Sequence, residues 1–204
     1  MPIRRENRFH SSNMPAFEQS PYFAQLVREA PLNELGPGQR NKKVCDALRA
    51  EPLAELFAPL KPRDKIATRA CVAGLLLLYD GLDESHSISQ DLADTTGSYW
   101  HAIMHRREPD YGNAKYWFAR VRRHPVYSAV SEAARELARD SLAKQPWPAA
   151  RWLLDEGSWQ AEAFVDLCQA ARSTGAEADL LCRNIQRKEC ELLLGFCFQA
   201  AIGD

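Results

Sequence analysis

The segment from Arg63 to Asp80 constrains the fold of this 204-residue chain more than any other. Its apolar residues recur every three or four positions, and apolar residues also occupy the neighbouring faces. This spacing predicts a helix that is apolar all round, which is typical of the central helix of a bundle. The uninterrupted apolar run, from Ala70 to Leu78, is too short for a membrane-spanning helix, which needs about 20 residues. We therefore expect a buried helix and no membrane association.

Helical spacing of apolar residues recurs along most of the chain. Further helices, bounded by proline, glycine or capping residues, are predicted over residues 20–30, 39–50, 53–58, 98–108, 113–124, 125–144, 158–173 and 176–201. No stretch alternates polar and apolar residues as a half-buried strand does. The prediction is an all-α protein, with a single-domain helical bundle of roughly seven to nine helices. The bundle is expected to cover residues 19–204, after a polar N-terminal arm at residues 1–18.

Charge and cysteine content exclude several classes of protein. The formal net charge is −1, so the chain lacks the broad basic surface that non-specific nucleic-acid binding requires. The basic N-terminus has no apolar segment behind it, unlike a secretory signal. The six cysteines include no CxxC pair and are expected to be buried free thiols in a reducing compartment. We therefore expect a cytoplasmic protein without a nucleic-acid or membrane partner, whose oligomeric state the sequence does not define.

Four of the five histidines lie between residues 80 and 124, together with most of the candidate site residues. Ser98 is expected to cap a helix that reaches Glu108, after a turn at residues 95–98. On that helix His101, His105 and Glu108 share one face, because their directions fall within about 60° of one another. This spacing makes His101, His105 and Glu108 the candidate catalytic residues.

A second polar stripe follows after a tight connection at residues 110–113. Its members lie four, three and four positions apart on the next helix: Asn113, Trp117, Arg120 and His124. A short connection favours an antiparallel hairpin, which would place His101 opposite Arg120, and His105 opposite Tyr116 and Trp117. The two stripes would then face each other across one groove.

The residues of this window also resemble a known family. The run from His101 to Asp110, continued by Asn113–Trp117 and His124–Pro125, is similar to a family of bacterial proteins for which no activity is established. The resemblance extends upstream to residues 82–86 and more loosely to residues 164–168, so that it covers roughly the C-terminal two-thirds of the chain. It indicates a site without indicating a reaction.

Three interpretations of the window remain open. The first is a pocket for an anionic small molecule such as a phosphate or carboxylate, in which His101 or His105 acts as a general acid or base. Its ligand-binding residues would be Arg106, Arg107, Asp110, Asn113, Lys115, Tyr116, Trp117, Arg120 and His124. No cofactor is assigned in this interpretation, and the nucleotide-binding patterns GxGxxG and the P-loop are not present.

The second interpretation is a metal site. His101 and His105 form a two-ligand clip on one helix face. The candidates that would complete it are Glu108, Asp83, Glu84 and His86. Ala102 stands where the zinc-protease pattern HExxH requires glutamate, so that class of protease is excluded. The third interpretation is a non-enzymatic protein in which Arg106 or Arg120, with Glu108 and Asp110, forms a buried ion-pair network.

Overall fold

The computed structural model describes residues 15–50 and 53–203, and these form ten α-helices and two short 3-10 helices, without a strand. The all-α prediction is confirmed, and the number of helices is slightly above the expected range. In chain order the elements are η1 (Ala16–Gln19), α1 (Pro21–Glu29), α2 (Lys42–Arg49), α3 (Ala54–Phe57), α4 (Lys65–Leu78), α5 (Leu82–Ser89), α6 (Thr95–Arg107), α7 (Tyr111–Val121), α8 (Tyr127–Lys144), η2 (Pro148–Leu154), α9 (Ala161–Thr174) and α10 (Ala176–Ile202).

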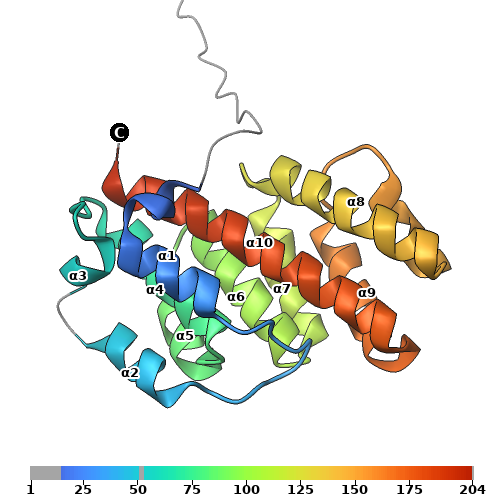
Figure 1. Cartoon of the computed structure of the whole chain (residues 1–204), viewed down its shortest axis with the longest axis horizontal. Helices are drawn as coiled ribbons and strands as arrows, with labels where there is room; N and C mark the ends of the chain where they lie inside the picture. The colour runs from blue at the N-terminus through green and yellow to red at the C-terminus, as the bar shows by residue number, and fades with distance from the viewer. Residues whose placement is uncertain (1–14, 51–52, 204) are drawn as a thin grey trace, which may run out of the picture.

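The long helix α10 runs across the molecule and packs against α4, α8 and α9 (Figure 1). Helix α4 is the expected central helix, since every residue from Ala70 to Leu78 is buried. Gly74 permits its close packing: a Cβ atom at this position would lie 2.5 Å from the Trp100 ring and 2.7 Å from Leu194. Helices α4, α6 and α10 therefore meet at Gly74, and this contact fixes α6 within the core.

The predicted N-terminal arm extends too far. Residues 1–14 lie outside the described part of the chain, but η1 begins at Ala16, within the range assigned to the arm. The Phe17 side chain is 3% exposed and stacks on Phe23 at a centroid distance of 5.7 Å. The apolar ring of Phe17 thus joins the core, and the domain starts before residue 19.

The start of α6 differs from the prediction. Residues 95–98 are not a turn, and Ser98 is not the cap; α6 begins at Thr95, and the Asp94 carboxylate accepts a hydrogen bond from the Gly97 amide at 2.7 Å. Gly97 is a packing residue, because a Cβ atom there would lie 2.4 Å from the Leu92 carbonyl oxygen. Asp94 is the cap because its side chain accepts from a free amide of the first turn, whereas the Ser98 hydroxyl lies within the helix and donates to the Asp94 carbonyl oxygen.

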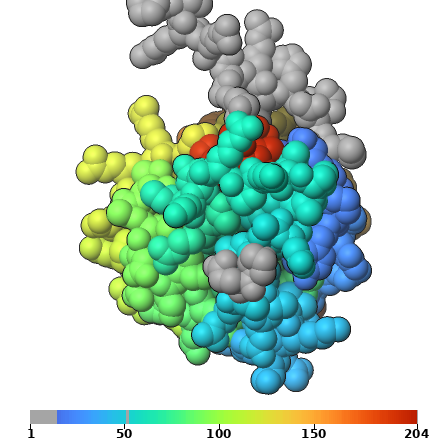
Figure 2. All heavy atoms as spheres, turned by 90° about the vertical axis from the view of Figure 1, so that its left-hand side faces the viewer, coloured from blue at the N-terminus to red at the C-terminus, as the bar shows by residue number. Residues whose placement is uncertain are grey.

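Other helix boundaries also differ from the predicted ones. Helix α7 ends at Val121 rather than near His124, and α9 begins at Ala161 without a cap from Ser158. Helix α5 was not expected, and it packs against α4 and α6. Figure 2 shows the face on which α2, in light blue, lies below the teal and green residues that follow it in the chain.

Two further expectations concern the helices and the thiols. None of the helices in the described ranges combines the length and the apolar character needed to cross a membrane. All six cysteines are buried free thiols, as expected.

Candidate functional site

Three histidines meet where α5 packs against α6. His86 lies on α5, and His101 and His105 follow one another by a helical turn on α6. The ring centroid of His86 lies 4.7 Å from that of His101 and 5.2 Å from that of His105, and the His101 and His105 rings stack at 4.7 Å. One nitrogen from each ring lies within 4.8 Å of the other two. We call His86, His101 and His105 the three-histidine cluster.

The two histidines of α6 are buried and incompletely hydrogen-bonded. Their exposed fractions are 3% for His101 and 7% for His105, and neither Nδ1 atom has a hydrogen-bond partner within the described residues. Burial, together with the neighbouring imidazoles of His105 and His86, lowers the pKa of His101 to about 4. Burial and His86 also lower the pKa of His105, while Asp110 partly offsets them. At neutral pH both rings are therefore uncharged and able to donate a nitrogen lone pair.

Two carboxylates border the cluster on one side. The Nδ1 atom of His105 lies 3.5 Å from the Glu108 carboxylate and 3.7 Å from that of Asp110. Burial raises the pKa of Glu108. Asp110 caps α7 and accepts a hydrogen bond of 2.6 Å from the Asn113 amide, which lowers its pKa. Asn113 thus orients a carboxylate next to His105, although its own side chain is exposed.

The α6–α7 hairpin is antiparallel as expected, but its register differs from the prediction. His101 faces Trp117 rather than Arg120: their rings stack at a centroid distance of 4.2 Å and an angle of 15°. His105 faces His86 rather than Tyr116 and Trp117. The connection between Arg107 and Tyr111 is short, and the facing residues His101 and Trp117 lie at equal distances along the chain from Pro109.

Arg120 lies beyond Trp117 and belongs to the exposed surface. Its guanidinium carbon lies 5.2 Å from the Trp117 ring centroid and 5.8 Å from that of Tyr116, which is 55% exposed. Lys115 forms an ion pair with Asp166 of α9. Neither cation contacts the three-histidine cluster directly.

Arg106 is not available for a ligand. Its side chain is fully buried, and its Nη2 donates to the Glu189 carboxylate of α10 at 2.6 Å. Burial alone would lower the pKa of Arg106, but Glu189 raises it above the usual value. Glu189 also accepts hydrogen bonds from the Tyr99 hydroxyl at 2.8 Å and from the Trp159 indole nitrogen at 3.2 Å. Arg106 is therefore the centre of a buried structural network.

Arg107 is also structural. Its guanidinium forms an ion pair with Asp80 and donates to the Gly36 carbonyl oxygen at 3.2 Å. Burial lowers its pKa, which Asp80 partly offsets. A buried ion-pair network was one of the three interpretations, but its acids are Glu189 and Asp80 rather than Glu108 and Asp110. With Arg106 and Arg107 paired, the arginine-lined anion pocket loses two of its predicted residues.

His124 lies apart from the cluster, because α7 ends before it. The ring is 5% exposed and packs on Tyr99 and Phe196. Its Nδ1 accepts a hydrogen bond from the Val126 amide, so its Nε2 is left to donate to the Thr96 hydroxyl at 3.2 Å. Burial lowers the pKa of His124 to about 4. It is a core histidine with both nitrogens satisfied.

Glu189 is the site-type residue that the sequence analysis missed. A signal for it exists, since Glu189 lies on the apolar stripe of α10 between Ile185 and Leu193, where a carboxylate requires a buried partner. Comparisons of this chain with protein-family models, with curated proteins and with solved structures return no match. The candidate site therefore depends on its geometry.

Proposed function

We propose that the protein binds a divalent transition metal ion, of the zinc class, through His86, His101 and His105. The observation that carries the proposal is the convergence of three imidazoles, with one nitrogen of each within 4.8 Å of the others. A tetrahedral zinc ion with bonds of about 2.0–2.1 Å needs ligand atoms about 3.4 Å apart. Small side-chain rotations would close this difference.

The hydrogen bonding of the cluster supports the same function. A buried polar atom without a partner costs about 1–3 kcal/mol, and the cluster holds two such atoms, Nδ1 of His101 and of His105. Metal coordination, or a hydrogen bond from a ligating imidazole to a carboxylate, would relieve this cost. Metal ions bind the neutral form of imidazole, which is the form that burial favours at both positions.

The surrounding charges also favour a cation. Glu108 and Asp110 lie 3.5 Å and 3.7 Å from Nδ1 of His105. Carboxylates commonly accept a hydrogen bond from the second nitrogen of a metal-bound histidine. In that arrangement Nε2 of His105 binds the ion, and Glu108 and Asp110 orient the ring. The adjacent arginines do not oppose this, because Arg106 and Arg107 are neutralised by Glu189 and Asp80.

Three imidazoles leave one position of a tetrahedral ion for water or another ligand, as in catalytic zinc sites. Glu108 is partly exposed and borders the cluster. Metal binding is the function that we propose here; the donor set suits zinc, cobalt, nickel or copper better than magnesium or calcium.

The test is thermal unfolding of metal-free, untagged protein with and without added zinc. At a free zinc concentration 100 times the dissociation constant, binding adds about 2.7 kcal/mol, which raises the melting temperature of a chain of this size by about 5–10 °C. His86→Ala should abolish this shift; His86 is partly exposed, so its loss costs little core packing.

His124→Gln is the matched control, because it removes a buried histidine outside the cluster and should keep the shift. The six cysteines remain in both variants, so thiol binding of zinc cannot explain a difference between them. The proposal fails if zinc, cobalt, nickel and copper all leave the melting temperature of the wild-type protein unchanged. It also fails if the His86→Ala variant responds to zinc as the wild-type protein does.

A further inference from the structure

A second candidate site lies at the junction of α7, α8 and α9. A cavity of about 390 Å³ opens there between the end of α7, Tyr127 at the start of α8, and the first turn of α9. Pockets for small molecules commonly measure about 300–1,000 Å³. The volume therefore suits a small metabolite, and none of the three-histidine cluster residues lines it.

The floor of the cavity is aromatic and carries one hydroxyl group that is not hydrogen-bonded to the protein. Phe118, Tyr127 and Trp159 line it with exposed fractions of 2%, 7% and 5%. The Trp159 ring is fixed by its hydrogen bond to Glu189. The Tyr127 hydroxyl, in contrast, has no hydrogen-bond partner among residues 15–50 and 53–203, and burial raises its pKa. The hydroxyl oxygen is not fully enclosed by protein, so it is free to donate to an acceptor on a ligand in the cavity.

The rim of the cavity offers donors for an anion. Arg122 lines the cavity and takes part in none of the ion pairs of the described residues, unlike Arg106, Arg107 and Lys115. The first turn of α9, residues 161–163, also lines it, and Gln160 provides no side-chain cap. The amides of a first turn are free donors and lie at the positive end of the helix dipole. Tyr127, Arg122 and these amides therefore offer hydrogen-bond donors to the same cavity.

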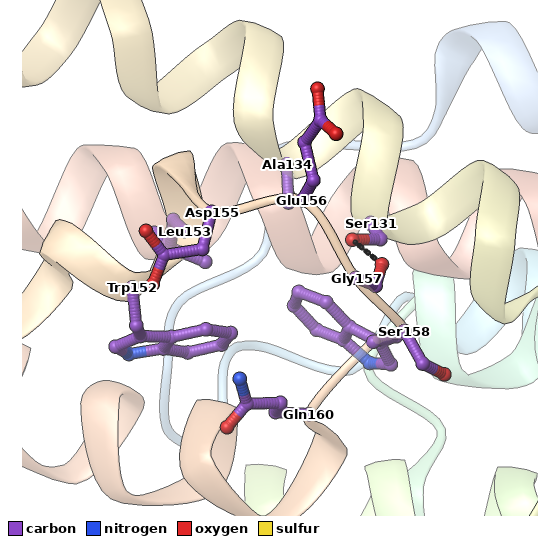
Figure 3. A pocket seen from close by; sticks show the side chains of 10 residues that line it. Ser131, Ala134, Trp152, Leu153, Asp155, Glu156, Gly157, Ser158 and Gln160 are labelled. Atoms are coloured by element: carbon purple, nitrogen blue, oxygen red, sulfur yellow. Dashed lines mark hydrogen bonds between the residues drawn. The ribbon is translucent and has the colours of Figure 1, made fainter.

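The loop that precedes α9 is anchored, so the wall of the cavity is preformed. Figure 3 shows the Ser131 hydroxyl of α8 donating to the Gly157 carbonyl oxygen, at 3.0 Å. The Arg135 guanidinium donates to the Asp155 carbonyl oxygen of the same loop. The small pocket beneath this loop measures about 20 Å³, which is room for about one water molecule. The loop is thus closed against α8, and the larger cavity next to it is the one with room for a ligand.

We propose that this cavity binds a small carboxylate with an aromatic or planar apolar body. The carboxylate accepts hydrogen bonds from Arg122, the Tyr127 hydroxyl and the first-turn amides of α9, and the body packs on Phe118 and Trp159. Glu162 is also in the first turn of α9 and lines the cavity. It would attract the ammonium group of an amino acid and gives a simple carboxylic acid no favourable contact.

Isothermal titration with 3-phenylpropionate and with L-phenylalanine tests this proposal, with phenethylamine as the probe that lacks a carboxylate. We expect at least one of the two carboxylates to bind with millimolar or better affinity, and phenethylamine, whose only favourable charged contact is with Glu162, to bind more weakly than that carboxylate. Arg122→Ala and Tyr127→Phe should each weaken binding by about 10- to 100-fold, because a hydrogen bond to a charged group contributes about 1.5–3 kcal/mol. Arg123→Ala is the matched control, since Arg123 is an exposed neighbour that does not line the cavity.

The relative affinities of L-phenylalanine and 3-phenylpropionate show which class of carboxylate the cavity binds. Tighter binding of L-phenylalanine, lost in Glu162→Gln, identifies an amino acid; tighter binding of 3-phenylpropionate identifies a carboxylic acid without an amine. The proposal is overturned if neither compound binds, or if binding is the same in Arg122→Ala and Tyr127→Phe as in the wild-type protein. It does not depend on the metal site, so His86→Ala should bind these compounds normally.

Discussion

Replacing Arg106 by methionine should strongly destabilise the protein, because it leaves the Glu189 carboxylate buried without its counter-charge. Both side chains are fully buried, and the ion pair measures 2.6 Å. Removing one partner of a buried ion pair typically costs about 3–5 kcal/mol. For a chain of this size the melting temperature should fall by about 10 °C.

The double variant Arg106→Met/Glu189→Gln separates the charge from the loss of packing. Glutamine keeps an oxygen that can accept the hydrogen bonds of Tyr99 and Trp159, while it removes the unpaired charge. The double variant should therefore be more stable than Arg106→Met alone, and such non-additivity measures the coupling of the pair.

Urea unfolding followed by circular dichroism gives the free energy of unfolding of each variant. Arg123→Met is the control for a cation on the surface and should change stability by less than about 0.5 kcal/mol. If Arg106→Met costs less than about 1 kcal/mol, or if the effects of Arg106→Met and Glu189→Gln simply add, Arg106 is not held in a buried ion pair. Its assignment to the structural network would then be wrong.

Two smaller effects follow from the caps and from the core histidine. Asp94→Ala should cost about 1 kcal/mol in urea unfolding, because it removes the cap of the Gly97 amide; a larger loss in Ser98→Ala would restore Ser98 as the cap. Because burial lowers the pKa of His124 to about 4 in the folded state, against about 6.5 when unfolded, protons bind the unfolded state first as the pH falls. Stability should therefore be unaffected by His124 above pH 6.5 and should fall toward pH 4 by at most about 3 kcal/mol. The difference in this acid sensitivity between the wild-type protein and His124→Gln measures the contribution, and parallel pH profiles would contradict it.

The helical periodicity of the sequence predicts most of the fold, because apolar residues at three- and four-residue spacing define the buried face of each helix. Helix α4 is the clearest example, with its buried run from Ala70 to Leu78. The spacing of apolar residues does not reveal helix α5, because Leu82 and Ile88 are its only large apolar residues. Its position is determined by packing against α4 and α6. The local spacing of residues in the sequence carries no information about that packing.

The sequence also predicts only part of the candidate site. The four-residue spacing of His101 and His105 places them on one face of α6, but only the packing of α5 brings His86 to the same point. Arg106 and Arg107 lie next to these histidines in the sequence, yet their side chains leave the helix in other directions. Their partners, Glu189 and Asp80, are 83 and 27 residues away, so no local pattern could identify these ion pairs.

The most direct test of the proposed metal site is a crystal of the protein grown with one equivalent of zinc, measured at the zinc absorption edge. Metal binding by the three-histidine cluster predicts one anomalous peak at about 2.0–2.1 Å from one nitrogen each of His86, His101 and His105. Zinc found only at cysteines or at surface residues, with the three imidazoles still in van der Waals contact, would contradict it.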